Sequence, residues 1–290
     1  MEQARSLLPE QQPLFAAAYN RSSFAFEHAL HELELFDVAA LRAMAERLPV
    51  PAYYSTVKSS VDDGWKHTGD RRPSLTETLE TLSETNSLVL LKHCEQDPQH
   101  GEVFRRLMDE VVAHVGEALG ADLEIGRATL IISSPHRITS YHIDAEVNFL
   151  LQVRGHKILY TFDPNDRSIL TDPELEAFYG GDWDGAHYRS ERQAEARSFS
   201  LAPGKGVHLP LHTPHWAQNL DDISVGVSLN FNLRSGARLA KLYKVNNRLR
   251  QAGLRPTSPG ASPWQDSLKL AALAAASRAR PLLPARLAKA

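Results

Sequence analysis

The chain of 290 residues is 42% hydrophobic and 23% charged, with a formal net charge of -3. This composition is typical of a soluble globular protein, and no apolar run approaches the roughly 18 residues of a membrane-spanning helix. Cys94 is the only cysteine, which excludes an intramolecular disulfide and argues against a zinc site built from thiolates. The first 15 residues lack the basic and apolar regions of a signal peptide, so we expect a cytoplasmic protein.

The first 120 residues predict a mainly helical region that packs on a core. Residues 22–48 repeat apolar side chains at helical spacing, and Asp37 is placed to cap a second helix within this stretch. The polar stretch 64–73 is expected to be a surface loop, with a substrate lid as the alternative. The remaining elements expected here are a short helix at 75–86, a buried strand at 87–94 and an amphipathic helix at 103–119.

Residues 121–233 have a different sequence pattern from the first 120 residues, and this pattern predicts a β core. Short apolar segments alternate there with Gly, Pro, Asn and Asp, a pattern that favours a sandwich or barrel of many short strands. One helix is expected at about 172–179, with Thr171 or Asp172 as its cap and Pro173 at its first position.

Residues 234–290 predict a basic helical extension with two helices, at 236–253 and about 265–280, joined by a Pro/Ser/Gly linker. The extension contains twelve Lys and Arg against one acid, Asp266, so its charge is near +11 and that of the remaining chain is near -14. Such a tail can pack across the acidic body or meet an anionic partner. No nucleic-acid-binding motif is present, and we expect no nucleic-acid partner.

The segment "TSYHIDAEVN" at 139–148 places a histidine and an aspartate two residues apart. In a strand, residues i and i+2 point to the same face, so His142 and Asp144 would project together. Two histidines and one carboxylate on one face of the metal form the ligand set of non-haem iron(II) oxygenases. A polar notch in a sheet is the alternative, and a third ligand decides between them.

The third ligand is expected among the later histidines. In "PGKGVHLPLHTPHWAQN" (203–219), a glycine turn leads into a strand and a second turn returns the chain to His215. We rank His215 first, His208 second and His212 third. The stretch resembles the second signature of the cupin superfamily, with His212 at the usual glycine turn position and Lys205 at the usual acid; the matching positions are Gly204, Pro210, His215 and Asn219.

Residues 125–233 resemble the core of the cupin-like and JmjC-type Fe(II)/2-oxoglutarate-dependent oxygenases. The shared pattern is His-x-Asp, an apolar strand, a Gly turn, a Lys and a strand ending near Pro. The nearest subgroup is the asparaginyl hydroxylase that inhibits hypoxia-inducible factor, with its bacterial relatives. The resemblance implies a double-stranded β-helix (cupin/jelly-roll) core flanked by N- and C-terminal helices, a mainly β fold with added α. It also implies Fe(II) and 2-oxoglutarate as cofactors.

Four further residues match that subgroup at fixed offsets from the ligands. The resemblance implies that Lys157 and Thr139 bind the far carboxylate of 2-oxoglutarate, and that Asn148 and Asn230 orient the co-substrate or oxygen site. Elementary chemistry agrees for Lys157, because a buried lysine is costly without an anion. A solvated lysine in a hairpin turn is the alternative. Tyr141 lies on the opposite strand face and is expected in the core.

The implied reaction consumes O2 and 2-oxoglutarate, releases succinate and CO2, and hydroxylates a C–H bond of a protein, peptide or small molecule. Trp183, Tyr188 and Arg189, in an insertion between strands, are weaker candidates for substrate contacts. The alternatives are a metal-binding cupin that does not use 2-oxoglutarate, such as an isomerase or direct dioxygenase, and a non-catalytic binding module. A homodimer through the C-terminal helices is also expected from the resemblance.

Overall fold

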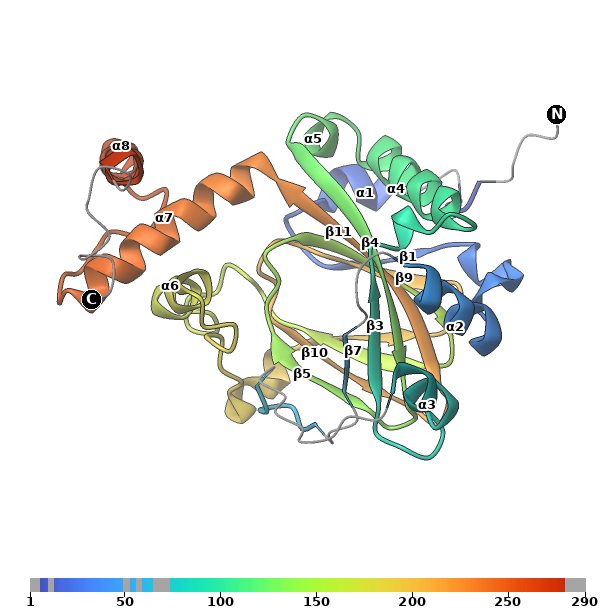
Figure 1. Cartoon of the computed structure of the whole chain (residues 1–290). Helices are drawn as coiled ribbons and strands as arrows, with labels where there is room; N and C mark the ends of the chain where they lie inside the picture. The colour runs from blue at the N-terminus through green and yellow to red at the C-terminus, as the bar shows by residue number, and fades with distance from the viewer. Residues whose placement is uncertain (1–5, 10–12, 49–52, 56–58, 65–73, 280–290) are drawn as a thin grey trace.

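In the computed structural model, two antiparallel sheets face each other and helices flank them (Figure 1). The structure describes residues 6–9, 13–48, 53–55, 59–64 and 74–279. The polar stretch 64–73 therefore lies, apart from Gly64, outside the described residues. No helix in the described part of the chain combines the length and the apolar character needed to cross a membrane.

The elements follow one another as a mixed front, a β core and a helical end. The helices are α1 (Pro13–Ala18), α2 (Val38–Arg47), α3 (Leu75–Glu80), α4 (Gly101–Val115), α5 (Glu117–Gly120), α6 (Asp172–Gly180), α7 (Arg234–Gln251) and α8 (Pro263–Ala279). The strands are β1 (Phe24–Glu27), β2 (Tyr53–Ser55), β3 (Leu88–Lys92), β4 (Leu123–Ser133), β5 (Ile138–His142), β6 (Val147–Arg154), β7 (Lys157–Thr161), β8 (Arg197–Leu201), β9 (Lys205–Leu209), β10 (His215–Asn219) and β11 (Ser224–Leu233).

The strand order identifies the expected double-stranded β-helix. The larger sheet runs β1-β9-β6-β11-β4-β3-β2 and the smaller one β5-β10-β7-β8. From β4 to β11, successive strands alternate between the two sheets, except that β7 and β8 both belong to the smaller sheet. Residues far apart in sequence therefore meet in the space between the sheets. The fold prediction is confirmed.

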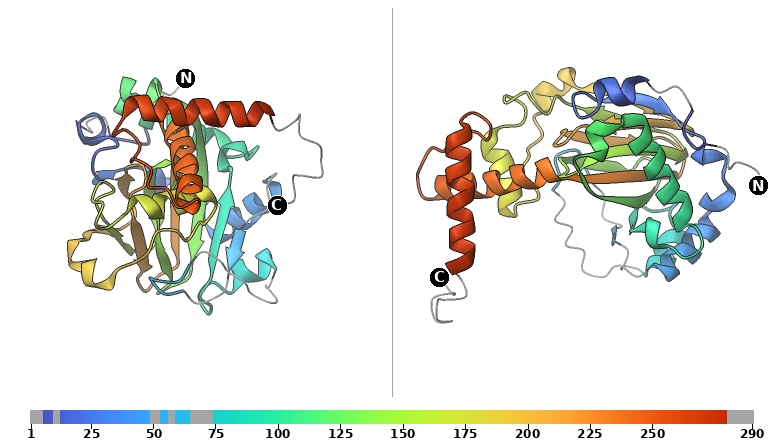
Figure 2. Two further views of the ribbon diagram at one scale, coloured as in Figure 1. Left: turned by 90° about the vertical axis from the view of Figure 1, so that its left-hand side faces the viewer. Right: turned by 90° about the horizontal axis from the view of Figure 1, so that it is seen from above.

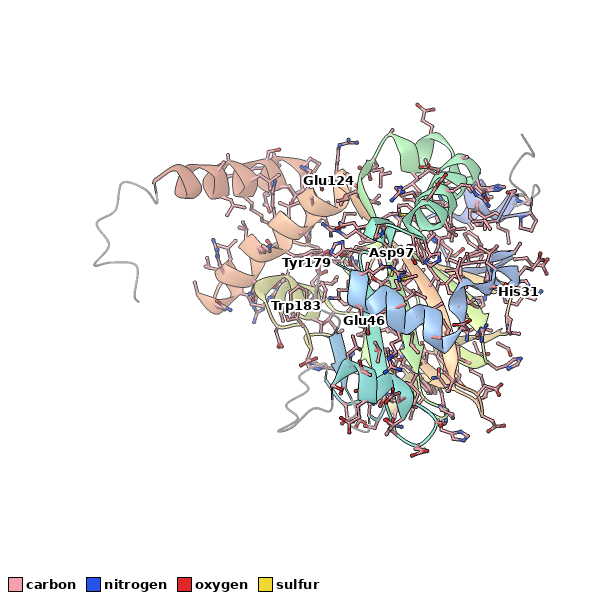
Figure 3. All side chains as sticks on the ribbon, turned by 45° about the vertical axis from the view of Figure 1, so that its right-hand side comes forward. His31, Glu46, Asp97, Glu124, Tyr179 and Trp183 are labelled. Atoms are coloured by element: carbon pink, nitrogen blue, oxygen red, sulfur yellow. The ribbon has the colours of Figure 1, made fainter. Side chains whose placement is uncertain are left out.

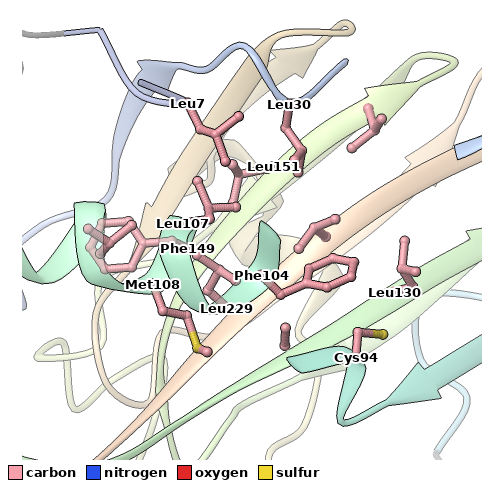
Figure 4. Close-up of a cluster of buried hydrophobic side chains, with 14 of the residues drawn as sticks. Leu7, Leu30, Cys94, Phe104, Leu107, Met108, Leu130, Phe149, Leu151 and Leu229 are labelled. Carbon is pink, nitrogen blue, oxygen red and sulfur yellow. The ribbon is translucent and has the colours of Figure 1, made fainter. Parts of the chain in front are cut away.

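Strand β11 shows how the sequence separates core from cavity. Leu229 and its neighbours at i±2 are buried in the main apolar cluster, whereas Ser228 and Asn230 face the opposite way, into the space between the sheets. Helix α4 covers the apolar face: Phe104, Leu107 and Met108 pack toward Leu229 and its sheet neighbours (Figure 4). Because of this alternation, the polar side chains of Ser228 and Asn230 can line a site between the sheets.

The prediction for residues 22–36 is wrong. This stretch forms β1 and two short 3-10 turns instead of a helix. Phe24 and Phe26 are buried while Ala25 and Glu27 are exposed, a period of two, and β1 pairs with β9 across 180 residues of chain. Long-range strand pairing therefore overrides the local apolar spacing. The second half of the stretch is helical as expected, and Asp37 caps α2 by accepting from the Ala40 N–H at 2.7 Å.

The other expected helices are present with shifted ends. The helix predicted at 103–119 is divided at Gly116, whose φ of 79° lies outside the helical region, into α4 and α5. Thr171, not Asp172, caps α6 in a capping box with Glu174, so Pro173 occupies the second helical position. The strand expected at 87–94 is β3.

The division into three regions remains a prediction about domains, but the β core is not confined to 121–233. Strands β1, β2 and β3 precede residue 121 and extend the larger sheet at both edges. After β11 the chain continues into α7, which packs on α6 and then carries α8 across its end, away from the sandwich (Figure 2).

Candidate metal and co-substrate site

A cavity of about 780 Å³ opens between the two sheets. Its walls come from the inward faces of β3, β4, β6 and β11 on one side and of β5, β7 and β10 on the other. The cavity contains the seven residues predicted for metal and co-substrate: Thr139, His142, Asp144, Asn148, Lys157, His215 and Asn230. Its size is in the ordinary range for sites that bind small molecules.

His142, Asp144 and His215 converge at one point of the cavity wall. Each offers one ligand atom, and these atoms lie within 4.8 Å of one another. The Nε2 atoms of His142 and His215 lie 3.9 Å and 3.8 Å from the two Asp144 carboxylate oxygens. The topology brings them together: β10 pairs with β5 and sets His215 opposite His142. Asp144 lies two residues beyond the end of β5, directly before the bend at Ala145 and Glu146.

Hydrogen bonds fix both histidine rings in an orientation that suits metal binding. The Nδ1 of His142 lies 2.7 Å from the Ser140 carbonyl, and the Nδ1 of His215 lies 2.8 Å from the Thr213 carbonyl. A carbonyl accepts only, so each Nδ1 carries the proton and each Nε2 presents a lone pair to the centre of the triad. Two neutral imidazoles and one carboxylate suit a divalent transition metal with open positions.

The electrostatics of the triad favour this state. Burial lowers the pKa of His142 to about 4. For His215, burial and then the neighbouring His142 lower the pKa to about 4. Both rings are therefore neutral at physiological pH. Burial raises the pKa of Asp144, and His215 offsets this only in part. A bound divalent cation would reverse the cost of ionising that carboxylate.

Lys157 is a buried cation that faces the cavity. Its residue surface is 4% exposed, and burial lowers its pKa to about 8. Among the described residues, no carboxylate lies within 4.0 Å of its Nζ. Such a group is costly to bury alone and suits an anion supplied by a ligand. Thr139, on β5, lines the same cavity.

Asn148 and Asn230 form one hydrogen-bonded group with Ser228. Strands β6 and β11 pair Asn148 directly with Asn230. The Nδ2 of Asn148 donates to Ser228 Oγ at 2.6 Å and to Asn230 Oδ1 at 2.8 Å, and Ser228 Oγ donates to Asn230 Oδ1 at 3.1 Å. The two predicted asparagines are therefore held together at the cavity wall, where they can orient a small ligand.

The other ranked histidines have structural partners elsewhere. His208 is fully buried, accepts from the Asn20 N–H at 2.9 Å and packs among aromatic rings. His212 bonds the Tyr179 hydroxyl at 2.5 Å, with φ at 63°. This left-handed conformation explains why glycine is usual at that position. Neither histidine belongs to the triad. Tyr141 is buried in an aromatic cluster, as expected.

Of the three substrate candidates, only Trp183 reaches the cavity. It follows α6 (Figure 3) and is 64% exposed. Its ring packs edge-on against Phe178. Tyr188 and Arg189 do not line this cavity, and a substrate contact for either residue stays a prediction. The Tyr188 hydroxyl donates to Gln193 at 2.8 Å, and Arg189 pairs with Glu174 at 3.1 Å, so both hold the insertion in place.

Several cavity residues were not predicted. Ser228 lies two residues before Asn230 on β11, so strand alternation could have indicated it. Glu146 lies in the connection between β5 and β6, where strand alternation does not apply. Arg127 and Lys92 face the same cavity from β4 and β3. Their strands join the site only through the sheet order, which the sequence does not reveal.

Solved structures share this fold at low sequence identity. An X-ray structure of Escherichia coli YcfD matches with a TM-score of 0.56 and 14% identity, over 94% of this chain and 68% of that one. A structure described as YcfD, a ribosomal oxygenase from Escherichia coli, in complex with cobalt and 2-oxoglutarate matches with a TM-score of 0.54 and 16% identity over the same shares. No protein-family model matches the sequence, and neither does any curated protein.

Proposed function

We propose that this chain is an Fe(II)- and 2-oxoglutarate-dependent oxygenase that hydroxylates a C–H bond of its substrate. The observation that carries the proposal is the presence, in one cavity, of a His-Asp-His triad and of a buried lysine whose Nζ has no carboxylate partner among the described residues. The fold shared with an oxygenase that binds cobalt and 2-oxoglutarate supports it as an analogy.

His142, Asp144 and His215 would hold the iron. A bound iron would supply the chemistry that couples oxidation of 2-oxoglutarate by O2, to succinate and CO2, with hydroxylation of the substrate. Lys157 and Thr139 would bind the far carboxylate of 2-oxoglutarate by charge and by a hydroxyl hydrogen bond. Asn148 and Asn230 would orient the co-substrate from the opposite wall.

Two other readings require different features. A cupin that binds a metal without 2-oxoglutarate needs no buried cation beside its metal site, and Lys157 argues against that class. A non-catalytic module has no use for three metal ligands with their tautomers fixed, and the intact triad argues against it.

The proposal is tested by succinate release from 2-oxoglutarate with added Fe(II). Wild type should form succinate slowly even without a prime substrate, whereas His142→Ala and Asp144→Ala should form none. His156→Ala removes an exposed histidine on the β6–β7 turn and serves as the control with wild-type activity. A wild-type protein that neither binds 2-oxoglutarate nor releases succinate would refute the proposal.

The lysine assignment has its own test. Lys157→Met should weaken 2-oxoglutarate binding to the Mn(II)-loaded protein by about 100-fold, because the buried carboxylate would lose its cation. Lys205→Met, which removes an exposed lysine paired with Glu27, should leave the affinity unchanged. Unaltered affinity in Lys157→Met would refute this assignment and leave the metal site untouched.

A further inference from the structure

A row of three charged side chains and one amide crosses the larger sheet beside the triad. Lys92 lies on β3, Arg127 on β4, Asn232 on β11 and Glu146 directly before β6. These strands are neighbours in the order β6-β11-β4-β3, and each of the four residues lies two positions from another residue that lines the cavity. Strand alternation and register therefore place Lys92, Arg127 and Asn232, and the start of β6 places Glu146 beside them. None of these residues is used by the proposed metal and 2-oxoglutarate sites.

The positive and negative parts of this row are kept apart by an amide. Asn232 Nδ2 donates to Glu146 Oε1 at 3.3 Å, and Asn232 Oδ1 accepts from an Arg127 guanidinium nitrogen at 3.4 Å. Within the described part of the chain, no ion pair of 4.0 Å or less joins Glu146 to Arg127 or Lys92. A purely structural role would favour a direct bidentate pair between the guanidinium and the carboxylate, which is the stronger interaction.

The position of the row suits a second ligand. Glu146 is two residues from Asp144, so the row borders the metal site, and Glu146, Arg127 and Lys92 all line the cavity. The volume of about 780 Å³ is large enough for a second small molecule beside 2-oxoglutarate. One end of the row offers a carboxylate and the other offers two cations, so a matching ligand carries both charges a short distance apart.

We propose that the substrate is a free amino acid, with its ammonium group bound by Glu146 and its carboxylate bound by Arg127 and Lys92. The inference rests on the proposed function and names its substrate class. A residue inside a polypeptide lacks both charges, and a chain terminus has only one. The side chain would extend toward the triad, where a C–H bond becomes C–OH while 2-oxoglutarate and O2 become succinate and CO2.

The test measures binding and turnover separately. Ligand-observed NMR on the Mn(II)- and 2-oxoglutarate-loaded protein would screen the twenty free L-amino acids, ornithine and citrulline. At least one should bind, and its N-acetyl and carboxamide derivatives should each bind about 30-fold more weakly, because each loses a charge-assisted hydrogen bond. With Fe(II) and O2, the same amino acid should accelerate succinate release and gain one oxygen atom.

Variants assign each end of the ligand. Glu146→Gln should bind the free amino acid and its N-acetyl derivative almost equally, and the Lys92→Gln/Arg127→Gln double variant should no longer prefer the free carboxylate over the carboxamide. Glu124→Gln and Arg154→Gln neutralise exposed residues outside the cavity and should keep both preferences.

The inference and the proposed function fail in different ways. Selective binding of a free amino acid without any succinate release would support the assignment of the charged row to an amino-acid ligand and refute the oxygenase. Normal uncoupled succinate release without binding of any amino acid would overturn the substrate class alone. Equal binding of end-blocked derivatives, or of an end-blocked peptide, would also overturn it.

Discussion

Lys157 is held in surroundings that oppose its own charge. Its folded-state pKa of about 8 lies below the usual 10.5 because burial disfavours the ammonium. The unfolded chain therefore binds more protons than the folded chain between pH 8 and pH 10.5, and this group makes the folded state more stable as the pH rises through that window. Below pH 8 the protein bears the full free-energy cost of burying the Lys157 ammonium.

Lys157→Met should therefore stabilise the ligand-free protein. The shift corresponds to an increase in the free energy of unfolding of about 3 kcal/mol at pH 7, and the gain should shrink toward zero near pH 10.5. Urea denaturation of both proteins at pH 7 and pH 10 measures the difference. A destabilised variant at pH 7 would contradict the account of Lys157 as a strained, ligand-dependent cation.

The triad predicts metal-dependent stability. Mn(II) at 100 times its dissociation constant should raise the free energy of unfolding by about 2.7 kcal/mol, because only the folded chain assembles the three ligands. The rise should vanish with EDTA and in Asp144→Ala, and it should persist in His156→Ala. An equal Mn(II) effect in Asp144→Ala would locate the metal elsewhere.

At the residue scale, residue types at fixed offsets were the informative part of the sequence. His142, Asp144, Lys157 and His215 were named on that basis, and the fold brings all four to one cavity, while their roles in metal and anion binding stay proposals. Tyr188 shows the limit of this reasoning. The sequence did not reveal that its hydroxyl donates to Gln193 within the folded insertion, outside the cavity, and its substrate contact stays a prediction.

At the element scale, two adjacent residues of β11 serve different purposes: Leu229 packs in the core, and Ser228 faces the cavity. Leu229→Ala should lower the free energy of unfolding by about 3 kcal/mol, since the side chain is fully buried beneath α4, and should leave the affinity of the folded protein for 2-oxoglutarate nearly unchanged. Ser228→Ala should lower the affinity for 2-oxoglutarate and leave the free energy of unfolding nearly unchanged, because Ser228 bridges Asn148 and Asn230. Denaturation and binding measured on both variants check the assignment. Affinity loss in Leu229→Ala alone would contradict the assigned strand faces.

The elements were predictable where local signals were sufficient. The Asp37 cap and the Thr171 capping box involve neighbours within three residues, and both helices form where expected. The stretch at Phe24 and Phe26 was not predictable, because its strand exists through pairing with β9, far away in the sequence. Arg127 could not be predicted as a cavity residue for the same reason, because its place in the cavity depends on the order of strands in the sheet.

At the scale of the whole molecule, α7 and α8 project beyond the sandwich (Figure 2). Arg238, Lys241, Lys244 and Arg248 lie exposed along α7, and the expectation of an anionic partner for this tail remains a prediction. Helix α8 also exposes Trp264 and Leu268, which are 68% and 62% accessible and lie one helical turn apart. Large exposed apolar side chains on a projecting element are typical of an interface.

We therefore expect a homodimer through the C-terminal helices. Light scattering should give twice the chain mass of 32.2 kDa for wild type and the monomer mass for Trp264→Ser/Leu268→Ser. Leu14→Ser, which removes a 48% exposed leucine of α1, is the matched control and should remain dimeric. A monomeric wild type at micromolar concentration would contradict this prediction.

The account depends most on the proposal that one cavity binds metal and co-substrate together. A crystal structure of the protein with Mn(II) and 2-oxoglutarate, prepared without O2, tests this directly. We predict anomalous density for manganese between the Nε2 atoms of His142 and His215 and the carboxylate of Asp144, with the far carboxylate of 2-oxoglutarate hydrogen-bonded to Lys157 Nζ. Manganese at any other ligand set, or 2-oxoglutarate bound away from Lys157, would contradict the account.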